Sequence, residues 1–99
     1  MNMSSPVIIN KEMGITHQEF FRNIPRALST DDFVKEADRI ILADGDESLE
    51  ISISEQSERR IALFVLPVTH VTLTFKGYTE AAVKKTMDKF DRAFQRGGG

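Results

Sequence analysis

Two segments of this chain alternate apolar and polar residues with a period of two, and this pattern restricts the fold more than any other feature. The alternation covers residues 49–54 and 70–76. Because successive side chains of a β-strand point to opposite faces, it predicts two strands that each have one buried and one exposed face. A continuous apolar run over residues 61–66 predicts a central strand, and residues 33–37 and 39–43 predict two shorter ones.

Turn signals separate these strands. Asp44-Gly45 predicts a β-hairpin with a type I′ turn, which needs positive φ at both central residues. The segment Leu66-Pro67-Val68-Thr69 is open to two interpretations: a tight connection between two strands, or a bulge in one bent strand. We favour the connection, because Pro67 has no amide hydrogen to donate to a β-ladder.

A capping box marks the start of a first helix. The side chains of Thr16 and Glu19 can each bind the other's backbone amide, which satisfies two donors that a helix start leaves free. Pro25 lacks an amide hydrogen and disfavours helical geometry at Ile24, so we expect the regular helix to end near Ile24.

A second helix is expected from the N-cap Thr79 to about residue 96, with Gly97 as its C′ residue. At about 100° per residue, an apolar stripe and a basic stripe lie on opposite sides of this helix. The apolar stripe consists of Val83, Met87, Phe90 and Phe94. The basic stripe consists of Lys85, Lys89, Arg92 and Arg96.

Together these elements predict a single α+β domain over residues 15–96. Its antiparallel four-stranded β-meander is flanked by an N-terminal and a C-terminal helix that pack on one face. Residues 1–14 are expected to be a loose segment that contains at most a short edge strand at residues 7–9. Residues 97–99 are expected to be a flexible glycine tail.

Composition excludes several classes of site. The chain has no cysteine, so it has no disulfide, no thiolate metal site and no cysteine nucleophile. No apolar run approaches the roughly 20 residues of a membrane span, and we expect no membrane association and a cytoplasmic location. The net charge of −2 combines ten acidic and two basic residues over positions 30–58 with three acidic and six basic residues over positions 76–99.

Two candidate binding surfaces emerge. The basic stripe could bind an anion or an acidic partner, although it equally fits a solvated helix face, and the net charge makes nucleic acid an unlikely partner. The second candidate is an apolar patch on the uncovered sheet face, because two short helices can cover only one face. Its members are Ala62, Phe64, Leu66 and the polar-face residue His70.

Weaker patterns have simpler interpretations. Arg59 and Arg60 could join Arg22 and Arg26 in an anion site, or form scattered surface ion pairs. Neither His17 nor His70 has a partner at metal-ligand spacing, and the acidic residues 44–50 do not follow the EF-hand pattern. The terminal glycines resemble the tails of ubiquitin-like modifiers and sulfur carriers, which follow a strand, whereas this tail follows a helix.

Four stretches resemble a small bacterial protein family of uncharacterised function. They are residues 20–28 (FFRNIPRAL), Arg59-Arg60-Ile61, Leu66-Pro67-Val68-Thr69, and the ending FDRAFQRGGG at residues 90–99. This resemblance implies no activity, cofactor or substrate.

The sequence therefore predicts a small non-enzymatic binding or adaptor module that needs no cofactor and associates with a protein partner or with itself. Two alternatives stay open. One is a carrier protein modified at Gly99, and the other is a weak anion or nucleic-acid binder that uses the basic stripe.

Overall fold

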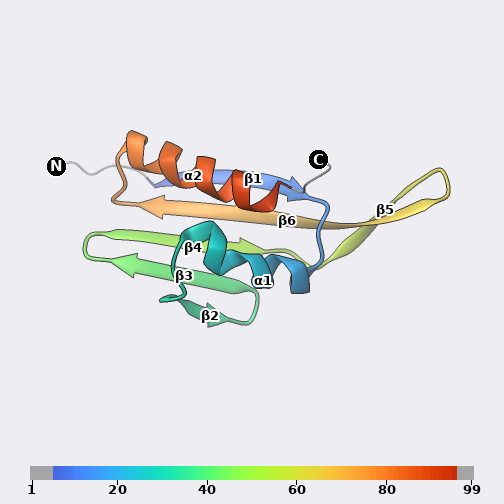
Figure 1. Ribbon diagram of the computed structural model, residues 1–99, viewed down its shortest axis with the longest axis horizontal. Helices are drawn as coiled ribbons and strands as arrows, with labels where there is room; N and C mark the ends of the chain where they lie inside the picture. The colour runs from blue at the N-terminus through green and yellow to red at the C-terminus, as the bar shows by residue number, and fades with distance from the viewer. Residues whose placement is uncertain (1–5, 96–99) are drawn as a thin grey trace.

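Over the residues that the structure describes, the protein is an α+β structure in which two helices accompany an antiparallel sheet of six strands (Figure 1). The computed structural model describes residues 6–95. The strands of the main sheet lie in the order β1-β6-β4-β3-β2, and β5 pairs only with the outer part of β6. The elements are β1 (Val7–Met13), α1 (His17–Leu28), β2 (Val34–Glu36), β3 (Arg39–Asp44), β4 (Glu47–Ile53), β5 (Ser57–Ile61), β6 (Phe64–Lys76) and α2 (Glu80–Phe94).

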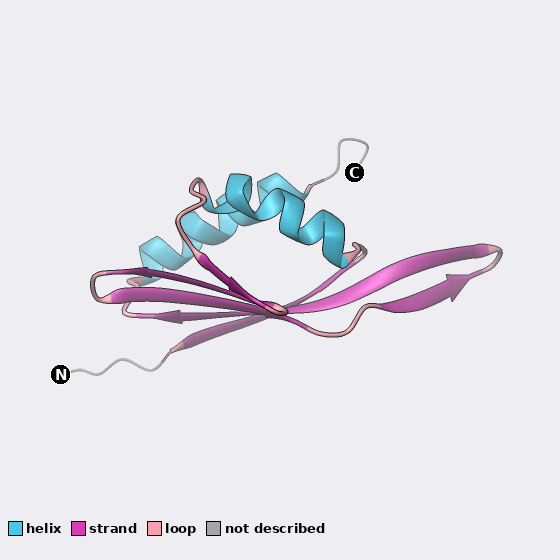
Figure 2. Cartoon of the chain, turned by 90° about the horizontal axis from the view of Figure 1, so that it is seen from below, coloured by secondary structure: helices cyan, strands magenta, loops and turns pink. Residues whose placement is uncertain are grey.

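The period-two segments form strands β4 and β6, and their apolar residues line one face of the sheet. Ile40 lies opposite Ile51, Ile51 lies opposite Leu73, and Leu73 lies opposite Ile9. This cross-strand row faces the two helices, which lie on the same side of the sheet in Figure 2. The opposite face carries mostly hydroxyl and charged side chains, together with the exposed apolar residues Ile8 and Val34, and is not covered by a helix (Figure 2).

The possible edge strand at residues 7–9 forms and is longer than expected, so the segment predicted to be loose over residues 1–14 is not loose between residues 7 and 13. Strand β1 covers seven residues, Val7–Met13, and pairs with β6 along its full length. Its apolar residues are interrupted by Asn10, Lys11 and Glu12, so the period is weak. Lys11 is held instead by an ion pair with Asp91 of α2, with the two charged atoms 2.8 Å apart. Residues 1–5 lie outside the described part of the chain.

The first helix starts as predicted and ends later than predicted. The reciprocal capping box of Thr16 and Glu19 is present. The helix continues past Pro25 for one more turn, in contrast to the expected end near Ile24. This turn buries two apolar side chains, Ala27 and Leu28. A Schellman motif closes it, because the amides of Ser29 and Thr30 donate to the carbonyls of Arg26 and Pro25.

The second helix begins at the predicted N-cap, where the Thr79 hydroxyl accepts a hydrogen bond from the Ala82 amide at 3.0 Å. Val83, Met87 and Phe90 are buried in the common core, as the apolar stripe predicted. Phe94 is half-buried, and its ring stacks on Phe20 of α1 with the ring centroids 5.4 Å apart. The expected C′ residue, Gly97, lies outside the described residues.

The Asp44-Gly45 hairpin forms, with its turn shifted by one residue. Asp44 pairs with Glu47, so the two central residues are Gly45 and Asp46 rather than Asp44 and Gly45. Of these residues only Gly45 has positive φ, at 62°, which differs from the expected type I′ turn.

Candidate functional site: a protruding β-hairpin

Strand β5 and the first part of β6 form a two-stranded hairpin, residues 57–68, that we call the arm. Its register runs without interruption from Ser57 opposite Val68 to Ile61 opposite Phe64. The arm extends beyond the end of the main sheet, and neither helix covers it (Figure 2). The molecule is consequently elongated, with principal extents of 53 × 27 × 24 Å.

The outer half of the arm exposes a concentrated group of large apolar side chains. Their exposed fractions are 51% for Ile61, 98% for Leu63, 68% for Phe64, 46% for Val65 and 43% for Leu66. Because cross-strand neighbours share a face, Ile61, Phe64 and Leu66 lie on one face of the arm and Val65 lies on the other. A contiguous exposed apolar group of this kind is the usual mark of an interaction surface.

The prediction of a central strand over residues 61–66 is therefore wrong. The chain reverses direction at Ala62 and Leu63, and the apolar run that normally indicates burial lies on a free hairpin instead. The turn contains no glycine, asparagine or aspartate, which are the residues that usually favour a hairpin turn. Ala62 adopts the left-handed conformation, with φ of 55°, without being a glycine.

We expect Ala62→Gly to stabilise the arm. Glycine removes the Cβ contact that makes left-handed backbone unfavourable by about 1–2 kcal/mol, and the greater flexibility of the unfolded chain cancels part of this gain. Amide hydrogen exchange should slow in residues 57–61 and 64–68, while exchange in α1 stays unchanged. Faster exchange in the arm would contradict the turn geometry.

Pro67 is neither a connection nor a bulge, because β6 runs straight through it as one 13-residue strand. At this position β6 has already left its two neighbours in the main sheet. Its last pairs are Ile53 opposite Val71 in β4, and Met13 opposite Thr69 in β1. Pro67 itself pairs with Glu58 of β5. One edge of β6 is thus unpaired here, and a missing amide hydrogen is tolerated as it is on edge strands.

The structure brings together three of the four predicted sheet-face residues. Ala62, Phe64 and Leu66 are all exposed on the arm rather than on the open face of the main sheet. His70 is exposed at the base, on the open face, and its backbone exchanges hydrogen bonds with Ser54. The buried Val68 lies between His70 and the apolar residues of the arm.

An ion pair joins the arm to the edge of the main sheet. The guanidinium of Arg59 in β5 contacts the carboxylate of Glu12 in β1. Arg60, the next residue, is exposed on the face of the arm that carries Val65. The predicted cluster of Arg59 and Arg60 with two α1 arginines is not assembled, since Arg22 and Arg26 line a hollow against the end of α2.

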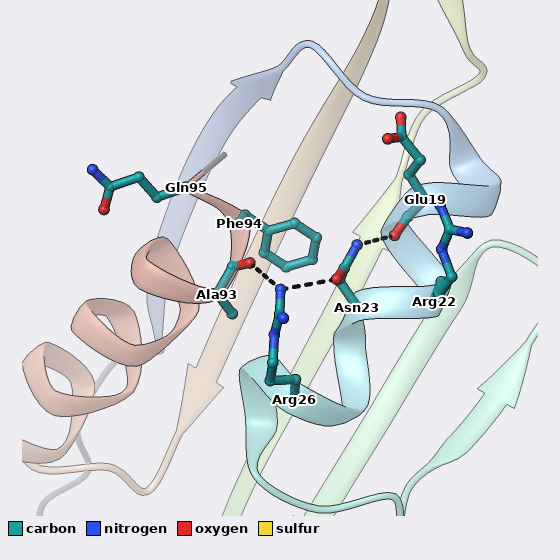
Figure 3. Close-up of a pocket in the computed structure, with 7 residues that line it drawn as sticks. All are labelled: Glu19, Arg22, Asn23, Arg26, Ala93, Phe94 and Gln95. Carbon is teal, nitrogen blue, oxygen red and sulfur yellow. Dashed lines mark hydrogen bonds between the residues drawn. The ribbon is translucent and has the colours of Figure 1, made fainter. Parts of the chain in front are cut away.

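That hollow, of about 390 Å³, lies between α1 and the C-terminal end of α2 (Figure 3). The Arg26 guanidinium donates to the Ala93 carbonyl at 2.7 Å and to the Asn23 side-chain oxygen at 3.0 Å. Asn23 in turn donates to the Glu19 carbonyl at 2.8 Å. Arg26 thereby satisfies one of the carbonyls that the end of α2 leaves free, and it fastens the two helices together.

Two members of the basic stripe, Lys89 and Arg92, line a neighbouring hollow together with Arg26. Lys85 is exposed elsewhere on α2, and Arg96 lies outside the described residues. Arg26 was not expected to lie beside this stripe. No sequence signal could have found the grouping, because the two helices are joined only by tertiary packing.

The remaining candidates have structural roles. The His17 ring nitrogen Nε2 lies 2.7 Å from the Ser54 carbonyl oxygen, which ties the start of α1 to the end of β4. Within residues 6–95, no group of three or more histidine and carboxylate side chains is arranged to hold a metal ion.

Another hollow lies at the end of the molecule opposite the arm, where Tyr78 meets the β3–β4 hairpin. Partial burial raises the pKa of Tyr78, and the nearby carboxylates of Glu47 and Asp44 raise it further. The half-buried ring packs edge-on against Phe75, with the centroids 5.0 Å apart.

Because Tyr78 is the only tyrosine and the chain has no tryptophan, phenolate absorbance reports on this residue alone. We expect its titration midpoint to lie above the ordinary value of 10.0, and Glu47→Gln to lower it. The unfolded chain loses this proton first as pH rises. The associated stability is therefore complete below about pH 10 and is lost as pH rises through the folded-state pKa. A midpoint at or below 10.0 in the folded protein would contradict this environment.

No protein-family model, curated protein or solved structure matches this chain. The resemblance to a bacterial family stays a prediction. Among the described helices, none is long and apolar enough to cross a membrane.

Proposed function

We propose that this protein is a small binding module that engages a protein partner through the arm. The observation that carries this proposal is the exposure of five large apolar side chains within residues 61–66. A partner that covers these side chains would gain roughly 25 cal/mol of hydrophobic free energy for each Å² removed from water. A folded body without the arm would bury the same common core, because no arm residue between 57 and 66 belongs to that core.

A matched pair of variants tests this proposal. In the arm variant, Leu63→Ser and Phe64→Ser are combined; in the control, Val34→Ser changes a residue that is 55% exposed on β2. Affinity capture from the native host, with each retained protein quantified against wild type, should show a partner lost with the arm variant and kept with the control. Equal capture by all three proteins would refute a binding function of the arm.

A second candidate function is anion binding at the α1–α2 hollow. One observation favours it: the fold adds Arg26 to Lys89 and Arg92, so that three cationic side chains from two helices line one depression. This candidate predicts salt-dependent retention on a heparin column that falls when Lys89→Glu and Arg92→Glu are combined. Unchanged retention of that variant would exclude the hollow as an anion site.

A further inference from the structure

An apolar groove runs between strand β1 and helix α2. It is lined by Val7 and Ile9 from the strand and by Val83 and Met87 from the helix, with Glu80 and Lys84 at its rim. Its volume is about 490 Å³. Val7 is 38% exposed, whereas Val83 and Met87 are each 9% exposed, so the groove has a closed floor and an open mouth.

The groove lies beside an open strand edge. β1 stands at the end of the strand order, and within the described residues it pairs only with β6. Its other edge presents amide and carbonyl groups that can accept an added strand. A strand that pairs with such an edge places alternate side chains into the adjacent groove, which is the geometry of β-strand addition. The groove is therefore suited to an extended segment with closely spaced apolar side chains.

The arm is such a segment, but a chain cannot insert its own arm into its own groove. Val7 lies opposite Phe75, near the far end of β6, whereas the arm begins at Val68 and points away from it (Figure 1). Phe64 and Phe75 are eleven residue steps apart along the extended strand, a distance of roughly 36 Å at about 3.3 Å per step. The arm that fills the groove must belong to another copy.

The apolar residues of the arm also favour a groove over a flat surface. Phe64 and Leu66 lie on one face, Val65 lies on the other, and Leu63 lies at the tip. A flat contact would leave one of these faces in water. A site between a strand edge and a helix can contact the arm on more than one side.

The areas involved favour a reciprocal exchange. The five exposed apolar side chains of one arm present roughly 500 Å², since such side chains expose on the order of 150–200 Å² each when fully free. With an equal area from the whole receiving surface, which includes the edge of β1 and the flank of α2 as well as the groove, one contact buries about 1,000 Å², which is below the roughly 1,200–2,000 Å² of a stable interface. Two equivalent contacts related by a two-fold axis reach about 2,000 Å².

We propose that two copies of this chain form a dimer in which each inserts its arm into the β1–α2 groove of the other. This inference rests on the proposed function of the arm and names a second copy as the partner. It assigns to Val7, Ile9, Val83 and Met87 a role as the receiving surface, and it accounts for both the exposed arm and the open edge of β1 by one contact.

Site-directed cross-linking provides a direct test, because the chain has no cysteine of its own. A Leu63→Cys variant is mixed with a Val7→Cys variant and treated with a short bismaleimide; Leu63→Cys mixed with Val34→Cys is the control. We expect a cross-linked heterodimer in the first mixture and none in the control. Cross-linking of Leu63→Cys with itself at the same yield, or with Val34→Cys, would overturn arm-to-groove exchange.

Sedimentation equilibrium of the full chain separates this inference from the proposed function. We expect a wild-type dimer and at least about 30-fold weaker association for Leu63→Ser with Phe64→Ser, since central interface side chains each contribute about 2 kcal/mol or more. A wild-type monomer would overturn the dimer, and the proposed function would then stand if host-protein capture still depended on the arm. Arm-dependent flotation with phosphatidylcholine vesicles, without dimers, would refute both.

Discussion

Replacement of Phe20 by alanine is expected to lower the free energy of unfolding by about 3–5 kcal/mol. Phe20 is fully buried at 0% exposure. Its ring stacks on Phe94 at 5.4 Å and meets Phe21 edge-on at 5.5 Å. It thus occupies the place where α1, α2 and the sheet share one core, and the alanine variant leaves a cavity that rigid strands cannot fill.

Urea denaturation followed by circular dichroism measures this change. Since domains of this size are stable by only about 5–15 kcal/mol, Phe20→Leu is the milder companion variant, with an expected loss of about 1 kcal/mol. The control is Phe21→Ala, at a half-buried ring beneath the Lys35 ammonium, for which we also expect a loss of about 1 kcal/mol. If Phe20→Ala lowered the free energy of unfolding no more than Phe21→Ala, the placement of Phe20 in the shared core would be wrong.

Local patterns in the sequence predicted the elements whose hydrogen bonds or side-chain periodicity involve only neighbouring residues. The capping box at Thr16 and Glu19, the N-cap at Thr79 and the period-two segments of β4 and β6 are short-range signals, and each forms as expected. The apolar stripe of α2 was likewise readable, because helical periodicity directs Val83, Met87 and Phe90 to one side whatever that side packs against.

Features that depend on distant partners could not be predicted in this way. β1 is held by its pairing with β6, more than fifty residues away, and Lys11 in its centre hides the apolar period. The helix passes Pro25 because Ala27 and Leu28 bury against a core that the local sequence does not reveal. Such tertiary contacts outweigh the roughly 3 kcal/mol that a proline costs inside a helix.

The arm, which is the candidate site, also could not be predicted from local patterns. An apolar run predicts burial, and residues 61–66 violate that rule in the isolated chain. The sequence singled out Ala62, Phe64 and Leu66 as an exposed apolar patch, and all three are exposed, but it placed them on the uncovered face of the main sheet, whereas they lie on the arm. Neither the turn at Ala62 nor the distant groove of Val7 and Met87 has a local signature, since each is defined by the register of β6.

Gly77→Ala is expected to lower the free energy of unfolding by about 3 kcal/mol or more. Gly77 joins β6 to α2 with φ of 79°, a conformation that costs an L-residue about 1–2 kcal/mol. A Cβ there would also overlap the backbone carbonyl oxygen of Asp46 in the β3–β4 turn. Because that contact is backbone rather than a flexible side chain, relief requires the turn or the strand to move, and overpacking of this kind costs about 1–3 kcal/mol more.

Gly45→Ala is the matched control, because Gly45 has a similar φ of 62° and nothing lies within 4 Å of its added Cβ. It should lose only the conformational contribution of about 1–2 kcal/mol, so the difference between the two variants isolates the overlap with Asp46. Both are measured by urea denaturation at equal protein concentration. Equal losses would show that β6 and the β3–β4 turn are not in close contact. The start of α2 forms one wall of the β1–α2 groove, and without that contact it would not be held in the orientation that the arm requires.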